Sequence, residues 1–242
     1  MATFLGGMGV RRLYGVPGGG STLDLIEAGR KRQMEFILAS NEASAAIMAA
    51  TEGDLSDRPG VCLAAHGPGV ANAVGGVAHA FQDRAPLLLL TDRLSRTSSR
   101  LAERQGLGHH RLLEEVTKGA ATITAPRSDR LLAWAWSKAL AAPRGPVHLD
   151  LPGDEAMRPA RRHSVRPVQE RPSDPSPSAI RAAARLLARR GRVVVLAGLG
   201  CRAPRAARAL QELVEHLGSP LLTTPRAKGA VPEDHPLAAG LF

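Results

Sequence analysis

The sequence predicts an α/β fold with a parallel six-stranded sheet and helices on both faces, followed by an incomplete second α/β unit. Three observations lead to this class. Short β-branched or apolar runs alternate with segments of helical period over the first 151 residues, which is typical of βαβ units. A proline-rich stretch without either period comes next. A second, shorter alternation begins after it.

The first alternation supplies the six strands of the predicted sheet. The expected strands are Arg12–Val16, Glu35–Ala39, Gly60–Ala65, Pro86–Thr91, Thr117–Ile123 and Val147–Leu151. The expected helices are Thr22–Gly29, Glu42–Gly53, Val70–Gln82 and Asp129–Ala141. Because each helix joins two strands that run in the same direction, helices are expected to cover both faces of the sheet.

The proline-rich stretch divides the chain into a first domain at 1–155, a linker at 156–177 and a second domain at 178–242. The second domain is expected to hold helices Ser178–Arg190 and Pro204–Leu217 and strands Arg192–Ala197 and Pro220–Thr223. Ser178 is expected to cap the first of these helices. Two parallel strands cannot cover their own faces, so we expect the second domain to be incomplete.

The composition excludes several classes of protein. No apolar run approaches the roughly 20 residues that span a bilayer, and the first residues lack the order of a secretory signal, so a cytoplasmic protein without a membrane partner is expected. The net charge is +10, but the arginines are dispersed and aromatics make up only 3%, which disfavours nucleic acid as a partner. Cys62 and Cys201 lack neighbouring ligands, so they are expected to be buried, reduced thiols, and no metal site is expected.

Three strand-to-helix turns are expected at one edge of the sheet, where ligands of open α/β sheets bind. The first is 15–20, rich in glycine, and the second is 66–69, followed by Asn72. The third places the carboxyl group of Glu42 in the first turn of a helix. Taken alone, Glu42 is most simply a structural acid at a helix N-terminus, and the glycines are most simply tight turns. Their convergence nevertheless favours a binding site.

Ordered motifs along the chain resemble one enzyme family. They are YGVPGG at 14–19, NEASAA around Glu42, RPGVCLAAHGPGVANAVGGVAHAFQDRAPLLLLTD at 58–92, VTKGA at 116–120 and GPVHLDLPGD at 145–154. This order resembles the pyrimidine domain of thiamine-diphosphate-dependent enzymes of the acetolactate synthase-like group. Residues 178–240, with VVVLAGLG and TTPRAKGAVPEDHPLAAG, resemble the start of that group's central domain.

The resemblance implies a role for each matching residue. Glu42 matches the glutamate that hydrogen-bonds the cofactor's pyrimidine ring and favours its imino tautomer, and Gln105 matches a glutamine near the reacting substrate. The residues that match the cofactor-binding stretches are Pro17, Gly18, Gly67, Pro68, Gly69 and Asn72. The implied function is decarboxylation or carboligation of 2-keto acids, as in a transferase of branched-chain amino acid biosynthesis.

Several features depart from the family. Asn41 stands where many relatives have histidine, and Ala50-Thr51-Glu52 replaces an acidic-glycine-aromatic run. The family's GDG…N motif, which binds magnesium and the diphosphate, is absent, since Gly53-Asp54 and Gly153-Asp154 do not continue as GDG. We therefore expect magnesium to be held by a domain outside this sequence. An FAD site, which some relatives have, is doubtful here.

These departures leave three functions open. The chain is a subunit or fragment of such an enzyme, acting as a homodimer or with a separate chain that binds the diphosphate. Alternatively it is a non-catalytic dimerisation or pairing module, which predicts exposed apolar helix faces. A nucleotide-binding protein is weakly supported by Gly198-Leu199-Gly200, because Ala203 replaces the third glycine that such a motif needs. His79, His109 and His110 are treated as structural or surface histidines.

Overall fold

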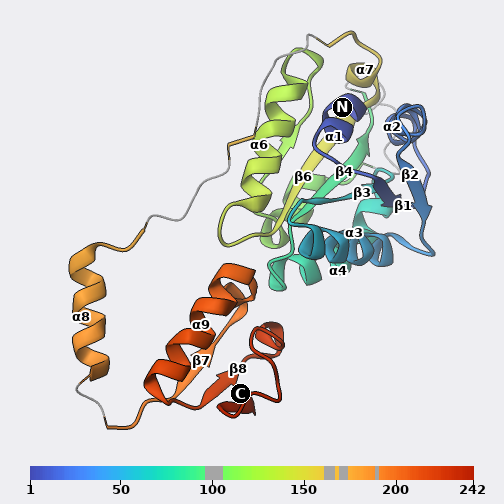
Figure 1. Cartoon of the computed structure of the whole chain (residues 1–242). Helices are drawn as coiled ribbons and strands as arrows, with labels where there is room; N and C mark the ends of the chain where they lie inside the picture. The colour runs from blue at the N-terminus through green and yellow to red at the C-terminus, as the bar shows by residue number, and fades with distance from the viewer. Residues whose placement is uncertain (96–105, 161–166, 169–173, 189–190) are drawn as a thin grey trace. The chain divides into compact units, whose positions relative to one another are not determined.

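The computed structural model describes residues 1–95, 106–160, 167–168, 174–188 and 191–242. By its internal contacts the chain divides into two compact units, Met1–Pro172 and Ser173–Phe242. Each unit is an α/β structure of its own and is described separately below (Figure 1).

The first unit is built on a six-stranded sheet in which every strand pair is parallel. The strand order is β2-β1-β3-β4-β6-β5. The strands are β1 (Arg12–Gly15), β2 (Glu35–Leu38), β3 (Gly60–Ala64), β4 (Leu87–Arg93), β5 (Ala120–Thr122) and β6 (Pro146–Pro152). This confirms the predicted fold class, with shifts only in the strand ends. Because all strands are parallel, their carboxyl ends lie at one edge of the sheet.

Helices join these strands. They are α1 (Ala2–Gly7), α2 (Gly20–Arg30), α3 (Glu42–Ser56), α4 (Pro68–Gln82), α5 (His109–Leu113), α6 (Ser128–Leu140) and α7 (Gly153–Ala156). Short 3₁₀ turns are formed by Glu114–Val116 and Ala125–Arg127. Helix α7 follows β6 directly, and the backbone N–H of Ala125 donates to Glu155 Oε2 at 2.7 Å, so this segment packs within the first unit.

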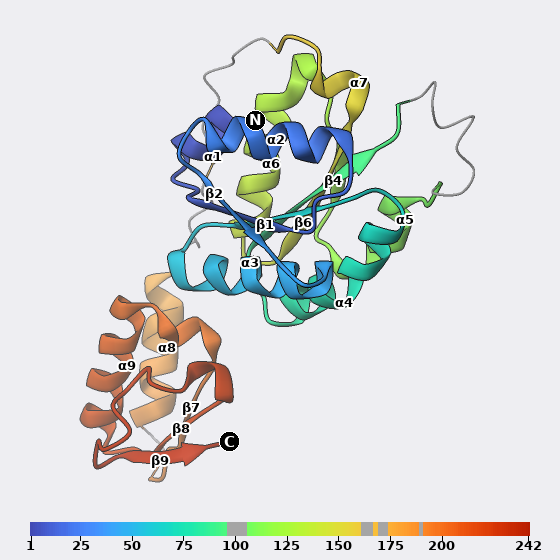
Figure 2. The same cartoon turned by 90° about the vertical axis from the view of Figure 1, so that its right-hand side faces the viewer.

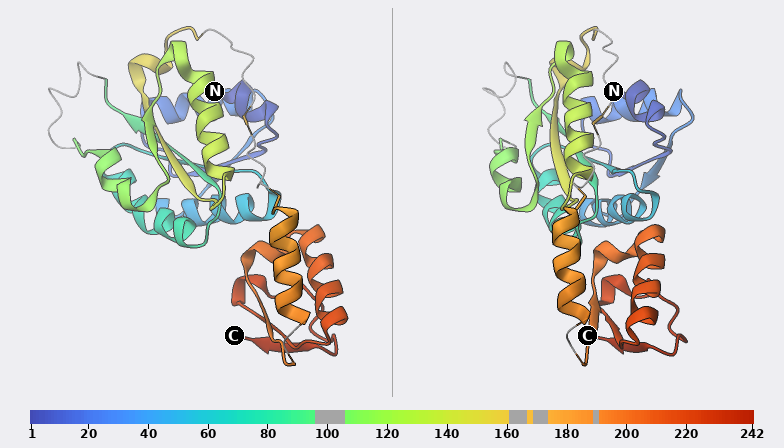
Figure 3. Two further views of the ribbon diagram at one scale, coloured as in Figure 1. Left: turned by 90° about the vertical axis from the view of Figure 1, so that its left-hand side faces the viewer. Right: turned by 60° about the vertical axis from the view of Figure 1, so that its left-hand side comes forward.

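The sheet is covered on both faces, as Figures 2 and 3 show. Helices α1, α2 and α6 pack on one face, where they form a core with Val61 and Leu63 of β3. Helices α3 and α4 pack on the other face, against Cys62 and Ala64. Since neighbouring residues of a strand point to opposite faces, β3 must be apolar throughout, and all five of its residues are buried.

The second unit contains a three-stranded parallel sheet in the order β7-β8-β9. Its elements are α8 (Pro177–Ala188), β7 (Val195–Ala197), α9 (Pro204–Leu217), β8 (Leu221–Thr223) and β9 (Ala238–Leu241), with 3₁₀ turns at Leu199–Arg202 and Pro225–Ala227. The prediction of only two strands here was wrong. Strand β9 was missed because its sequence, AAGL, has no β-branched or aromatic residue.

The ends of α8 and the two cysteines also refine the predictions. The backbone N–H of Ala179 donates to Ser176 Oγ at 3.2 Å, so Ser176 caps this helix, and the prediction that Ser178 does so was wrong. Both cysteines are free thiols, but only Cys62 is buried, whereas Cys201 is half-buried. Among the described residues, no helix combines the length and apolar character needed to cross a membrane.

Candidate functional site

The carboxyl edge of the first sheet has a point where the chain's course reverses. Strand β1 lies between β2 and β3, so the chain leaves β1 toward one side and later returns to its other side. In open α/β sheets, the crevice at such a point is the usual ligand site. The turns after β1 and β3 meet there, because a Cβ added to Gly18 would lie 3.0 Å from Cβ of Ala65.

Glu42 lies at this edge as the first residue of α3. The preceding Asn41 has extended backbone and caps the helix, since its side chain accepts from the backbone N–H of Ser44 at 2.8 Å. Glu42 is only 8% exposed. The free N–H groups of the first helical turn favour a negative charge here, which offsets part of the cost of burying a carboxylate.

The surroundings of the Glu42 carboxyl group come from α4 and β3. Asn72 Nδ2 donates to Glu42 Oε2 at 3.3 Å. A Cβ added to Gly69 would lie 3.2 Å from Glu42 Oε1, so the absent side chain leaves space beside that oxygen. On the strand, burial raises the pKa of the Cys62 thiol, and the negative charge of Glu42 raises it further. Cys62 is therefore an inert neutral thiol next to the carboxylate.

Gly67 sets the start of α4 and has a backbone conformation that only glycine adopts readily. Its φ is 63° and its ψ is −109°, which is outside the regions allowed to residues with a Cβ. Its carbonyl accepts from the N–H of Ala71 at 3.0 Å. Its own N–H donates to Nε2 of His109 at 3.1 Å. The glycine turn is therefore tied to helix α5.

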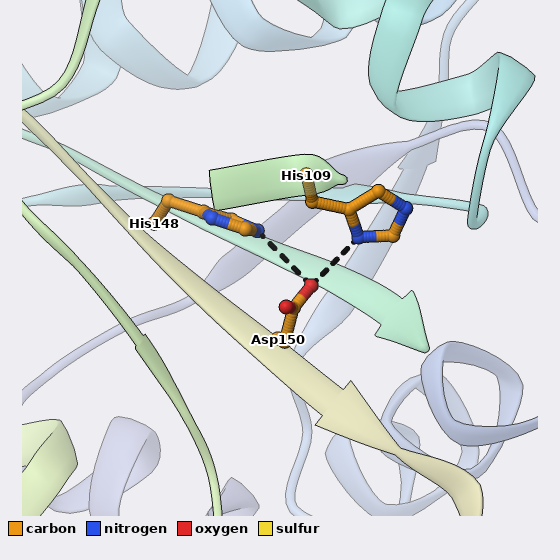
Figure 4. A group of neighbouring side chains, drawn as sticks. All are labelled: His109, His148 and Asp150. Atoms are coloured by element: carbon orange, nitrogen blue, oxygen red, sulfur yellow. Dashed lines mark hydrogen bonds and ion pairs between the residues drawn. The ribbon is translucent and has the colours of Figure 1, made fainter. Parts of the chain in front are cut away.

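A second buried carboxylate, that of Asp150 in β6, contacts the other ring nitrogen of His109. Figure 4 shows its carboxylate between the rings of His109 and His148, with separations of 2.7 Å to His109 Nδ1 and 3.4 Å to His148 Nε2. Thr91 Oγ1 donates to Asp150 Oδ1 at 2.8 Å, and Arg93 Nη1 donates to Oδ2 at 2.7 Å. Nε2 of His110 lies 3.0 Å from Oδ2. Asp150 is thus surrounded by donors and positive charge.

These contacts decide the charges in the group. Burial alone would raise the pKa of Asp150, but hydrogen bonds from His109, His110 and His148 outweigh it and hold that pKa far below its usual value. Burial lowers the pKa of His148, against the opposing hydrogen bond to Asp150. The group therefore contains a permanent carboxylate and a histidine that favours the neutral state.

A third buried acid, Asp92 at the end of β4, holds the glycine-rich turn after β1. Its Oδ1 accepts from the backbone N–H of Thr22 and its Oδ2 from Thr22 Oγ1, both at 2.9 Å. Ser21 Oγ also donates to Oδ1, and Asp92 Oδ2 lies where a Cβ on Gly19 would be. Asp92 thus caps α2 from strand β4 and fixes the path of the 15–20 turn.

Two hollows open at this edge, of about 330 and 390 Å³. Both are lined by His66, Arg93 and Leu94. His109 adds to the lining of one, and Asp92 to that of the other. Glu42 lines neither of them.

The structure brings most of the predicted site residues together. Glu42 lies beside Asn72 and Gly69, and Gly67 and Pro68 begin the helix that carries both. Pro17 and Gly18 lie on the adjoining turn and are exposed, as is Pro68. Gln105 lies outside the described residues.

The sequence interpretation missed the residues that support this arrangement. His109 was treated as a structural or surface residue, and the structure buries it between Gly67 and Asp150. Asp150 and Asp92 were seen only as parts of strand motifs. The one available signal was a polar residue at alternate positions in HLD, inside an otherwise apolar strand. His79 is exposed and lies 3.5 Å from the carboxylate of Asp83, as expected of a surface histidine.

Comparisons with known proteins give the family. Residues 1–118 match the N-terminal thiamine pyrophosphate-binding domain of thiamine pyrophosphate enzymes, and residues 180–242 match their central domain. The sequence is also 32% identical over 244 residues to a probable acetolactate synthase large subunit of Methanocaldococcus jannaschii, covering 96% of this chain and 41% of that protein. The chain belongs to the thiamine pyrophosphate enzyme family. Thiamine pyrophosphate is the cofactor called thiamine diphosphate above.

Other members of this family show similar matches. A probable 2-ketoarginine decarboxylase of Pseudomonas aeruginosa is 32% identical over 248 residues, covering 99% of this chain and 44% of that protein. The solved structure of a thiamine diphosphate-dependent 4-hydroxybenzoylformate decarboxylase of Rhodococcus jostii RHA1 superposes with a TM-score of 0.89, at 20% identity, over 99% of this chain and 46% of that one. At this identity the likeness shows the fold. The chain spans less than half the length of these relatives.

Proposed function

We propose that this thiamine pyrophosphate enzyme chain supplies the pyrimidine-binding half of a cofactor site in an acetolactate synthase-like enzyme that decarboxylates or joins 2-keto acids. One observation carries the proposal. A buried carboxyl group, that of Glu42, has a single side-chain hydrogen bond among the described residues, from Asn72, and lies beside a glycine that leaves space next to its other oxygen.

The residues around Glu42 fit an aminopyrimidine ring. Burial keeps water from competing for the carboxyl group, so a ring nitrogen at hydrogen-bond distance would share its proton strongly. A side chain at position 69 would occupy the space that lies within 3.2 Å of Glu42 Oε1. The Gly18 turn lies against Ala65, just before the turn that begins α4, so it forms a second wall close to the same site.

When bound, the cofactor would supply the stabilisation of a carbanion that 2-keto acid chemistry requires. The chain's part would be to hold a proton between Glu42 and the pyrimidine ring, and so to set the protonation of the ring. Asn72 would orient the carboxyl group. We also propose Gln105 as a residue that contacts the substrate, on the strength of the family resemblance alone.

We place the diphosphate- and magnesium-binding residues outside these 242 residues. Gly53-Asp54 lies within helix α3, and Gly153-Asp154 begins α7, so neither pair forms the loop of a GDG motif. The missing residues would come from a further domain or from a separate chain. The names of the relatives support 2-keto acids as substrates, because they include a 2-ketoarginine decarboxylase and a 4-hydroxybenzoylformate decarboxylase.

A non-catalytic pairing module is the second candidate, and one observation favours it. Helix α3 exposes Ile47, Met48 and Leu55, with exposed fractions of 39%, 38% and 74%. An apolar stripe of this kind on a soluble protein marks a contact surface. The surface is compatible with a homodimer in either function, so a test must address Glu42 itself.

The test is a double-mutant cycle between Glu42 and the pyrimidine ring. Calorimetry would measure the binding of thiamine diphosphate with Mg²⁺, in the presence of a chain that carries the GDG…N motif. The four combinations pair wild type or Glu42→Gln with the cofactor or with an analogue in which carbon replaces the ring nitrogen. We expect the wild type to discriminate against the analogue by about tenfold or more, and Glu42→Gln to discriminate little. Equal discrimination by both proteins would exclude the proposed role of Glu42.

A further inference from the structure

The hydrogen bonds of His109 fix which of its nitrogens carries the proton. A backbone N–H can only donate, so His109 Nε2, which lies 3.1 Å from the N–H of Gly67, must accept. The proton of the neutral ring is then on Nδ1, where it donates to Asp150 Oδ1 at 2.7 Å. A neutral imidazole in this tautomer satisfies both partners.

The same geometry argues against a metal ion at this place. One ligand atom from each of His109, His148 and Asp150 lies within 4.8 Å of the other two, as a bound cation would require. However, a cation on Nδ1 of His109 would leave the proton on Nε2, where it would face the N–H of Gly67. Arg93 also occupies Asp150 Oδ2 at 2.7 Å with its positive charge. The group is better described as a hydrogen-bond network.

The network ends at Gly67, the N-cap residue of helix α4. Gly67 has a φ of 63° and a ψ of −109°, a conformation that needs support from its surroundings. Its N–H is bound by His109, and its carbonyl accepts from Ala71 of α4. Gly69 and Asn72 follow in the same helix, and both lie against Glu42. A change in the bond between His109 and Gly67 would therefore shift the two residues that shape the Glu42 pocket.

We propose that His109, held in its Nδ1-protonated form by Asp150, is a positioning residue for the Glu42 pocket, acting through the Gly67 turn. Only one part of this proposal, the expected effect on binding of the pyrimidine ring, rests on the proposed function. Its structural part, the hydrogen bond from the Gly67 N–H to His109 Nε2, is independent of the cofactor. Asp150 and His148 of β6 lie against the ring. Arg93 of β4 and His110 of α5 contact the same Asp150 carboxylate.

The first measurement concerns the ring and the turn without any ligand. In the full chain at neutral pH, a long-range ¹H–¹⁵N spectrum should show Nε2 of His109 unprotonated. Hydrogen exchange at the same pH should show a protected Gly67 amide. A proton on Nε2, or a Gly67 amide that exchanges as fast as an unprotected one, would overturn the proposal.

The second measurement uses variants of His109. His109→Leu should reduce the protection of Gly67 and weaken the binding of thiamine diphosphate with Mg²⁺ by about tenfold. His109→Gln should retain the protection, because its amide oxygen can accept from Gly67. His79→Gln, on the exposed part of α4, is the control and should resemble wild type. If His109→Leu does not fold, the protonation state of Nε2 in the wild-type spectrum decides the matter.

The two proposals fail in different ways. If no protein binds the cofactor, or Glu42→Gln binds it with wild-type discrimination, the proposed function is wrong, whereas the Gly67 protection data still test the positioning role. If Gly67 is equally protected in wild type and in His109→Leu, the positioning role is wrong whatever the cofactor does.

Discussion

Two buried carboxylates of the first unit, Glu42 and Asp150, have opposite surroundings. Asp150 has no exposed side-chain surface and is contacted by Thr91, Arg93 and three histidines. Glu42 is 8% exposed, and its one side-chain hydrogen bond among the described residues is 3.3 Å long. A buried acid whose oxygens all have partners stabilises the fold. A buried acid with few partners can still accept a hydrogen bond from a ligand. The comparison fits a structural role for Asp150 and the binding role that we propose for Glu42.

The largest effect should come from removing the Asp150 carboxylate, which has a partner on each of its oxygens. Asp150→Ala leaves Arg93 and the buried histidines without their anion, and we expect the free energy of unfolding to fall by about 3 kcal/mol. This is the lower end of the usual range because Arg93 is half-exposed. Urea denaturation at neutral pH would measure it. Glu42→Gln is the matched control and should cost less than about 1 kcal/mol. A larger loss for Glu42→Gln than for Asp150→Ala would reverse the comparison.

The next largest effect should come from filling the space beside Glu42. In Gly69→Ala the new methyl group would lie 3.1 Å from Cβ of Ala65 and 3.2 Å from Glu42 Oε1, which should cost about 1–3 kcal/mol of stability and weaken cofactor binding. Gly75→Ala, in the same helix, meets nothing within 4 Å and should be neutral or stabilising by up to about 1 kcal/mol. Thermal unfolding and cofactor titration of the pair would show the difference. Identical behaviour would mean that the space at position 69 is unimportant.

The helix start that presents Glu42 should have a smaller effect. Asn41→Ala removes the side-chain acceptor for the N–H of Ser44, and we expect a loss of about 1 kcal/mol. Asn41→Asp keeps an acceptor and should retain most of that stability. Denaturant unfolding of the two variants measures the cap. If Asn41→Asp loses as much as Asn41→Ala, the cap does not explain the position of the helix start.

The smallest effect should be on the pH dependence of the free energy of unfolding, to which His148 contributes. Burial lowers its pKa in the folded state, so as the pH falls below about 6.5 the unfolded chain binds more protons than the folded one. The free energy of unfolding should therefore decrease with falling pH in this range. His148→Gln lacks the titrating group, and its stability should fall less steeply. Chemical denaturation at several pH values would compare the slopes, and equal slopes would contradict the burial argument.

The sequence allowed the sheet of the first unit to be predicted because its signals are local. Apolar runs such as LLLL at 87–90 indicate strands without knowledge of their neighbours, and glycine turns follow some strands, as at 15–20 and 67–69. Elements with weak local signals were missed. Helix α5 has five residues, HHRLL, and β9 has four. The strand order β2-β1-β3-β4-β6-β5 was likewise not predictable from period alone.

The candidate site was predictable only in part, for a related reason. The family resemblance singled out Glu42 and the glycine turns, which are short, contiguous motifs. The link from Asp150 through His109 to Gly67 has two steps. Asp150 and His109 are 41 positions apart in the chain, and His109 and Gly67 are 42 positions apart. Such a link depends on how α5 packs against β6 and the turn before α4, and no local pattern encodes it.

One measurement tests the central claim, that the Glu42 carboxyl group shares a proton with the pyrimidine ring. It is the rate at which the C2 proton of thiamine diphosphate exchanges with deuterium, followed by NMR with Mg²⁺ and a chain that carries the GDG…N motif. We predict that Glu42→Gln slows this exchange by about a hundredfold or more relative to wild type. Equal rates in the two proteins would contradict the account.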